Sequence, residues 1–337
     1  MPNNIVLAEP IQVKLFAYKL PFRNPMQFKQ YQLHQREGLI LQIIDKNGVN
    51  RFAEIAPLPG FSKETFAQVK QEMIQLISGS GSILNKLTKH MSAYPSIQFA
   101  LDSILLAINT TQEITIDNVA LLQGNRATII SQYKQLDHPE LIKLKVAKES
   151  IDIDIDNFQQ LCQLNPKLKI RCDANQAWNE KQAEQFFTAI NIKQLDYIEE
   201  PTCDHQKNLK LAEKFSIKLG LDETLQQSNF NYQAHQSIRA FIIKPALIGS
   251  KHKIDKLVSI AKSSAIKISI SSSFESIVGL QQLKHLATSY LHHSQQKTLA
   301  LSLGIDTLKY FSSTQLQDKN KIEDECQQLE LLCSSNK

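Results

Sequence analysis

The feature that most restricts the fold of this chain is a repeated alternation of short apolar segments with helical ones in its second part. Segments rich in β-branched residues begin near residue 119 and recur roughly every 20 to 30 residues. Strands that alternate with helices at this spacing pair in parallel through right-handed crossovers. The expected strands are residues 119–122, 141–146, 168–172, 195–198, 217–221, 238–243, 266–271 and 299–303. Eight such units favour a closed α/β barrel over an open sheet.

The first part of the chain has a different pattern. Residues 11–53 read as strands. Ser62, with Glu64 soon after it, indicates the start of a helix, and a second amphipathic segment covers residues 96–108. The polar tail is expected to end in a helix over residues 321–332 that packs back on this first module. The predicted domains are residues 1–110, an α+β module; residues 111–312, the barrel; and residues 313–337, the returning tail.

Composition argues against several classes of protein. The net charge of +5 comes from scattered lysines, and no basic cluster is interleaved with aromatic residues, so we expect no nucleic-acid partner. No apolar run reaches the roughly 18 residues of a membrane span, so we expect no membrane partner. The five cysteines are irregularly spaced, which favours a reducing compartment, and we predict the cytoplasm. A monomer and a small homo-oligomer are both compatible with the sequence.

Charged residues stand at the carboxyl ends of five consecutive predicted strands. They are Lys143, Lys145, Asp173, Glu199, Asp222 and Lys244. Each alone has an ordinary explanation as a surface lysine or an acid that caps a helix. Active sites of barrels lie at these strand ends, however, so the joint pattern predicts one site.

The residue types indicate the chemistry of that site. Lys143 and Lys145 are two apart on one strand, so both side chains point toward the barrel mouth. Repulsion between their ammonium groups is expected to lower a lysine pKa toward the range of a working base. Three carboxylates suit Mg²⁺, and the absence of strand-end histidines argues against zinc or iron. Lys244 is expected to face the lysine pair across the mouth. The residues alone thus predict Mg²⁺-assisted removal of a proton next to a carboxylate.

The sequence around these positions resembles the enolase superfamily, in its muconate-lactonizing-enzyme subgroup. The similar segments are RCDANQAW at 171–178, IEEP at 198–201, LDE at 221–223, IKP at 243–245 and SSSFES at 271–276. EIAPLPGFS at 54–62 is similar to the capping-domain loop of the o-succinylbenzoate synthase family, and GIDTL at 304–308 resembles that family's eighth-strand segment. Together these segments span nearly the whole chain.

The resemblance implies a (β/α)7β barrel covered by a capping domain, which the N-terminal region and the C-terminal tail form together. It implies a lyase that dehydrates 2-succinyl-6-hydroxy-2,4-cyclohexadiene-1-carboxylate to o-succinylbenzoate, a step of menaquinone or phylloquinone synthesis. The loop at Pro59 and Gly60 would close over the mouth and exclude water.

The resemblance also implies a role for each site residue. Lys145 would remove the proton, Lys244 would face the substrate ring as a cation, and Lys143 would tune the base. The metal ligands would be Asp173, Glu199 and Asp222, holding Mg²⁺, with Mn²⁺ as an alternative ion. The residues that would position the small carboxylate substrate are Arg171, Asn175, Ser272 and Gly304.

Two alternatives stay open. An N-succinylamino-acid racemase or a dipeptide epimerase of the same subgroup would use Lys145 and Lys244 as bases on opposite faces of one carbon. Dipeptide epimerases carry two acids at the eighth strand, whereas this chain has only Asp306 there. A barrel without catalytic activity is disfavoured, because a buried cluster of charges destabilises a fold that has no ligand for it.

Overall fold

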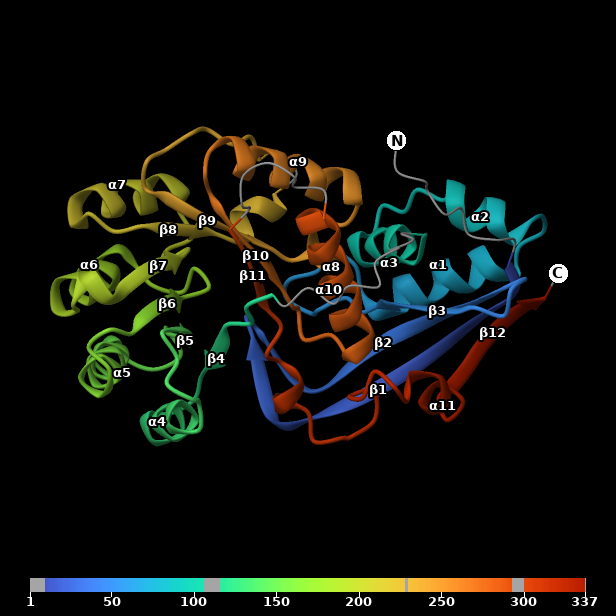
Figure 1. Ribbon diagram of the computed structural model, residues 1–337, viewed down its shortest axis with the longest axis horizontal. Coiled ribbons are helices and arrows are strands. Elements are labelled where there is room, and N and C mark those ends of the chain that lie inside the picture. The colour runs from blue at the N-terminus through green and yellow to red at the C-terminus, as the bar shows by residue number, and fades with distance from the viewer. Residues whose placement is uncertain (1–9, 106–115, 228–229, 293–299, 337) are drawn as a thin grey trace.

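The computed structural model describes residues 10–105, 116–227, 230–292 and 300–336, which form a barrel with an α+β module beside it (Figure 1). In the module, which we call the cap, the sheet order is β12-β1-β2-β3 and all pairs are antiparallel. The strands are β1 (Pro10–Phe28), β2 (Tyr31–Asp45), β3 (Asn50–Ile55) and β12 (Glu330–Asn336). The helices are α1 (Phe66–Ser78), α2 (Ile83–Lys89) and α3 (Pro95–Leu105).

The cap sheet is buried on both faces, which explains the unbroken apolar run of β2. Leu39 and Leu41 pack toward the helices, in one cluster with Met73 of α1. Ile40 points the other way and packs in a cluster that includes Val278 of the barrel. Successive strand residues face opposite sides, so a strand covered on both sides must be apolar at every position.

Two expectations for the cap need correction. The first helix begins at Phe66, after a capping box of Thr65 and Gln68, and not at Ser62. Glu64 is buried instead, where it accepts hydrogen bonds from the backbone and hydroxyl of Ser96. Helix α3 agrees with the predicted segment up to Leu105, and residues 106–108 lie outside the described residues.

The predicted tail helix over residues 321–332 is wrong in most of its length. Only α11 (Ile322–Cys326) is helical, and β12 then pairs antiparallel with β1. The free edge of β1 supplies backbone partners that outweigh the helical pattern of the tail. The tail therefore does return to the cap, but as an edge strand. The domain boundaries proposed from the sequence stay predictions.

The barrel is a sheet of eight parallel strands among the described residues. In order around the barrel they are β4 (Ala120–Leu122), β5 (Leu141–Lys145), β6 (Lys169–Asp173), β7 (Leu195–Glu199), β8 (Leu219–Leu221), β9 (Ile238–Ile243), β10 (Lys267–Ser271) and β11 (Leu301–Gly304). A parallel bridge between Asn118 and Leu303 closes the ring. Each strand overlaps a predicted segment, so the predicted α/β barrel is confirmed; residue 299 lies outside the described part.

Helices surround the barrel (Figure 1). They are α4 (Arg126–Lys134), α5 (Ile151–Leu164), α6 (Glu180–Ala189), α7 (His205–Phe215), α8 (Pro245–Ile248), α9 (Lys251–Ser263) and α10 (Ile277–His292), with the 3-10 turns η1 (Ile192–Gln194), η2 (Glu223–Gln226) and η3 (Leu308–Tyr310). In the described part of the chain, only η2 lies between β8 and β9, and β11 is followed by η3 before the chain returns to the cap. No described helix is long and apolar enough to cross a membrane.

Candidate active site

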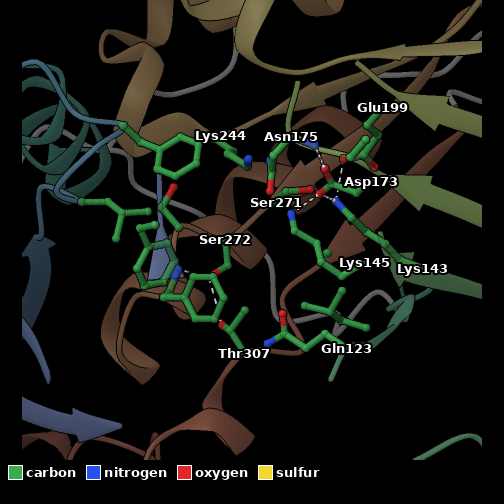
Figure 2. A pocket seen from close by; sticks show the side chains of 18 of the residues that line it. Gln123, Lys143, Lys145, Asp173, Asn175, Glu199, Lys244, Ser271, Ser272 and Thr307 are labelled. Atoms are coloured by element: carbon green, nitrogen blue, oxygen red, sulfur yellow. Dashed lines mark hydrogen bonds and ion pairs between the residues drawn. The ribbon is translucent and has the colours of Figure 1, made fainter. Parts of the chain in front are cut away.

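A cavity of about 420 Å³ opens at the carboxyl ends of the barrel strands and is covered by cap residues (Figure 2). Strand β5 shows how the sequence directs its side chains there. Ile142 and Leu144 are fully buried among the surrounding helices, while Lys143 and Lys145 line the cavity. The alternation of a pleated strand thus separates core residues from site residues.

The lysines and carboxylates of the predicted site form one cluster, the mouth cluster, made of Lys143, Lys145, Asp173, Glu199, Asp222 and Lys244. Lys143 Nζ lies 2.8 Å from Asp173 Oδ2 and 2.6 Å from Glu199 Oε2. Lys145 Nζ lies 2.8 Å from the same Asp173 oxygen. These contacts bring the ends of β5, β6 and β7 together at one point (Figure 2).

Lys244 reaches the cluster from the far side of the barrel. It follows β9, which stands four places from β5 in the order of eight strands, and it forms an ion pair with Asp222. The prediction that Lys244 faces the lysine pair across the mouth is therefore confirmed. A substrate between Lys145 and Lys244 would have an amine on each side.

The expected lowering of a lysine pKa is wrong for Lys143. Burial favours a lower pKa, but the charges of Asp173 and Glu199 outweigh it and raise the pKa of Lys143 well above its usual value. Burial lowers the pKa of Lys244 too, yet Asp222 and Glu223 together raise it. The sequence predicted these carboxylates at the same barrel mouth, but the expected pKa considered only the repulsion between the two lysines.

Three carboxylates crowd into this buried cluster. Burial raises the pKa of Glu199 to about 8; Lys143 acts against this, while Asp173 and Asp222 add to it. Among the described residues, no three His, Cys, Asp or Glu side chains are arranged so that they could hold a metal ion together. In this structure the oxygens of Asp173 and Glu199 are paired with the ammonium groups of Lys143 and Lys145. The donor set itself, three carboxylates and no histidine, suits the oxygen coordination of Mg²⁺.

A second row of acids holds the metal-ligand candidates in place. Glu200 is buried and accepts hydrogen bonds from the backbone N–H groups of Asp222 and Thr224, at 3.0 and 2.8 Å. Asn175 donates from its backbone to Asp173 Oδ1 and from its side chain to Glu223 Oε1, both at 3.0 Å. Glu200 and Glu223 thus orient the strand ends.

The candidates for substrate positioning differ in their surroundings. Arg171 lies deeper in the barrel, where it donates to Asp196 and to Ser302, both at 3.1 Å. Ser272 lines the cavity and contacts Glu275 and Thr307. A Cβ at Gly304 would begin 2.7 Å from Ser271 Oγ, so a side chain there would fill the strand-end space. The four positioning roles stay predictions.

Buried polar side chains dock the cap on the barrel, and no pattern in the sequence predicted this arrangement. Arg36 is 1% exposed and donates to the carbonyls of Pro57 at 2.7 Å and Phe274 at 3.1 Å. Glu54, within the segment similar to a capping loop, accepts from Ser276 Oγ at 2.5 Å and from Gly279 N at 2.8 Å. Both residues join segments more than 200 positions apart, which no local pattern reveals.

Other cavity residues were also missed. Gln123, Ser271 and Thr307 come from the barrel (Figure 2). Phe61 comes from the cap. Ser271 belongs to the SSSFES segment, but only Ser272 of its serines was proposed as a site residue.

Two family models match the chain: the MenC N-terminal domain over residues 11–108 and the enolase C-terminal domain-like family over residues 131–320. An o-succinylbenzoate synthase from Aliivibrio salmonicida (strain LFI1238) is 30% identical over 304 residues, which cover 88% of this chain and 90% of the relative.

Solved structures share the fold. The o-succinylbenzoate synthase from Thermosynechococcus elongatus BP-1, complexed with Mg in its active site, has a TM-score of 0.72 at 22% identity and covers 94% of this chain and 100% of its own. The N-succinyl Arg/Lys racemase from Bacillus cereus ATCC 14579 has a TM-score of 0.75 at 16% identity, with coverage of 97% and 99%. With its matched sequence, its barrel and its strand-end cluster, the chain belongs to the o-succinylbenzoate synthase family, lyases of the enolase superfamily.

Proposed function

We propose that this protein catalyses the Mg²⁺-dependent dehydration of 2-succinyl-6-hydroxy-2,4-cyclohexadiene-1-carboxylate to o-succinylbenzoate. The observation that carries the proposal is the mouth cluster, in which Lys145 and Lys244 stand on opposite sides of a cavity and three carboxylates lie between them. Family membership supports the choice of this substrate. The product belongs to menaquinone or phylloquinone synthesis.

Lys145 removes the proton from the ring carbon next to the carboxylate, and the ring C–O bond then breaks. The same amine, now protonated, gives its proton to the departing hydroxyl, so one water leaves and the ring becomes aromatic. Lys145 can act as a base only when its ammonium is not paired with Asp173, as when that carboxylate binds the metal. Lys143, whose pKa is raised by Asp173 and Glu199 against the effect of burial, stays charged beside Lys145.

Asp173, Glu199 and Asp222 would hold the Mg²⁺ ion. When bound, Mg²⁺ supplies positive charge that stabilises the negative charge developing on the substrate carboxylate. The ammonium of Lys244, on the other side, stabilises charge spread over the ring. The use of Mn²⁺, the oligomeric state and the cytoplasmic location stay predictions.

A direct assay tests the proposal. Purified protein is mixed with the cyclohexadiene substrate, and loss of the substrate chromophore is followed with Mg²⁺, after chelation, and after Mg²⁺ is restored. We expect turnover only when Mg²⁺ is present. A protein that binds Mg²⁺ in calorimetry but leaves the chromophore unchanged would contradict the assignment.

Racemisation of N-succinylamino acids is the second candidate, because Lys145 and Lys244 could serve opposite faces of one carbon. A dipeptide epimerase is less compatible with the site. The single acid near the end of β11, Asp306, pairs with Lys309 at 2.5 Å and accepts from Leu121 N, so it is not free to bind a substrate amine. Incubation of N-succinyl-L-amino acids in D₂O, with loss of optical rotation as the readout, tests for racemisation.

A further inference from the structure

Two lysines line the cavity without taking part in the mouth cluster. Lys148 belongs to the loop after β5, and Lys29 to the tip of the hairpin between β1 and β2. Neither forms an ion pair with a carboxylate within the described residues, whereas Lys143, Lys145 and Lys244 all do. The cavity thus carries two positive charges that no carboxylate of the described residues pairs with directly.

Lys148 is held at the cavity by its own loop. The preceding residue, Ala147, has a positive φ of 60° and also lines the cavity. Its N–H donates to the buried carboxylate of Asp154 at 2.8 Å, while Val146 N donates to Asp173 O at 3.0 Å. The two residues that lead to Lys148 are therefore both fixed by hydrogen bonds.

The ammonium of Lys148 contacts only a weak partner among the described residues. Its Nζ lies 3.3 Å from the carbonyl oxygen of Gln27 in the cap, so it bridges the cap and the barrel. Burial lowers the pKa of Lys148, and the charge of Lys145 lowers it further. These are the surroundings of a cation that lacks a counter-ion.

Lys29 approaches from the cap. Its backbone has a φ of 51°, a conformation in which glycine or asparagine is the usual residue, so a lysine there is held at some cost in free energy. Its Nζ lies 4.6 Å from the centre of the Phe61 ring, and Lys244 Nζ lies 5.7 Å from the same ring. Lys29 therefore points over the aromatic cover of the cavity.

We propose that Lys148 and Lys29 together bind the second carboxylate of a dicarboxylate substrate, the one at the end of its succinyl chain. The inference rests on the proposed function, in which the first carboxylate lies at the mouth cluster. Charge-assisted hydrogen bonds from two ammonium groups select an anion over a neutral chain end. One ammonium comes from the barrel and the other from the cap, so an anion between them also draws the cap onto the site.

Binding of two ligands to the Mg²⁺-loaded protein tests this assignment. The probes are o-succinylbenzoate and its derivative with the succinyl carboxylate converted to an amide, which differ in one charge. We expect wild-type protein to bind the dicarboxylate about tenfold more tightly. Lys148→Gln should reduce that ratio several-fold, and Lys148→Gln with Lys29→Gln should bring it to about one.

Lys148→Arg and Lys253→Gln serve as controls. The arginine variant keeps the charge and should keep the ratio, and Lys253 is an exposed residue of α9 that does not line the cavity. A purely structural effect would weaken both ligands equally and leave the ratio near wild type. A double variant that folds, as judged by its Tm, and retains the wild-type ratio overturns the inference.

The binding assay does not depend on turnover, so it separates this inference from the proposed function. If wild-type protein prefers the dicarboxylate but does not catalyse the dehydration, the proposed function is contradicted and the role of the two lysines is not. If dehydration is normal but neither lysine affects the ratio of the affinities for the dicarboxylate and its amide, the role of Lys148 and Lys29 is contradicted and the proposed function is not.

Discussion

The barrel contains two clusters of charge, one at each end, and they differ in how the charges are matched. The base cluster consists of Arg171, Asp196, Arg239 and Lys267, where three cations surround one carboxylate. Asp196 lies 3.1 Å from Arg171 Nε and 3.2 Å from Lys267 Nζ. Burial favours a higher pKa for Asp196, but Lys267 and Arg171 outweigh it and lower the pKa.

The mouth cluster is crowded with acids instead. There the pKa of Glu199 is raised to about 8, because burial and two neighbouring carboxylates prevail over Lys143. The same residue types therefore stabilise one end of the barrel and leave the other end with an electrostatic cost. Such a cost is typical of sites where a ligand supplies the missing charge. The comparison predicts that substitutions in the mouth cluster affect activity, and that substitutions in the cluster around Asp196 affect stability.

The largest effect is expected for Lys145→Ala. Loss of the general base should lower kcat by about a thousandfold or more, and exchange of the substrate α-proton in D₂O should stop. The Tm and Mg²⁺ binding should change little, because the lysine supplies no metal ligand. NMR detection of normal proton exchange in the variant would remove Lys145 from this role.

Glu199→Gln should separate metal binding from stability. Removal of one carboxylate is expected to weaken Mg²⁺ binding by about a hundredfold, measured by calorimetry. The Tm of the metal-free protein should not fall, since a charge that is costly in the folded state has been removed. A marked fall in Tm in this variant would show that Glu199 stabilises the fold, as Asp196 does, and would contradict the comparison.

Asp196→Asn should have the opposite effect. It leaves Arg171 and Lys267 without their carboxylate, and we expect the free energy of unfolding at pH 7 to fall by about 2 kcal/mol. The folded pKa of Asp196 lies below its ordinary value of 3.8. Its contribution to stability is therefore present above pH 3.8 and is lost as the pH falls through the folded pKa. Urea unfolding of variant and wild type should thus differ at pH 7 and converge in acid.

The smallest effect is expected for Phe61→Leu. Leucine keeps the apolar cover but removes the ring beside Lys29 and Lys244, which should lower kcat/KM two- to fivefold, about the size of an exposed cation–π contact. Phe215→Leu, which removes the ring beside Lys214 outside the cavity, is the matched control. Equal kinetics for the two variants would show that the cap ring does not influence the site.

Much of the fold and the position of the site could be predicted from the sequence. Regular spacing identified the eight strands, and parallel strands place all their carboxyl ends at one mouth. Asp173, Glu199 and Lys244 therefore had to meet, whatever the details of packing. The tail was mistaken for a helix, because its pattern is local and the edge of β1 that it joins is remote in sequence.

The sequence by itself determined which residues reach the barrel mouth, because strand period and parallel order depend on short-range pattern. The tertiary structure alone decided how their charges pair, and this pairing raises the pKa of Lys143 above its ordinary value. It also decided how the cap meets the barrel, since Arg36 reaches the carbonyl of Phe274 and Lys29 reaches the cavity only through the fold. Electrostatic free energy depends on distance and burial in space, and neither is a property of neighbouring positions in a chain.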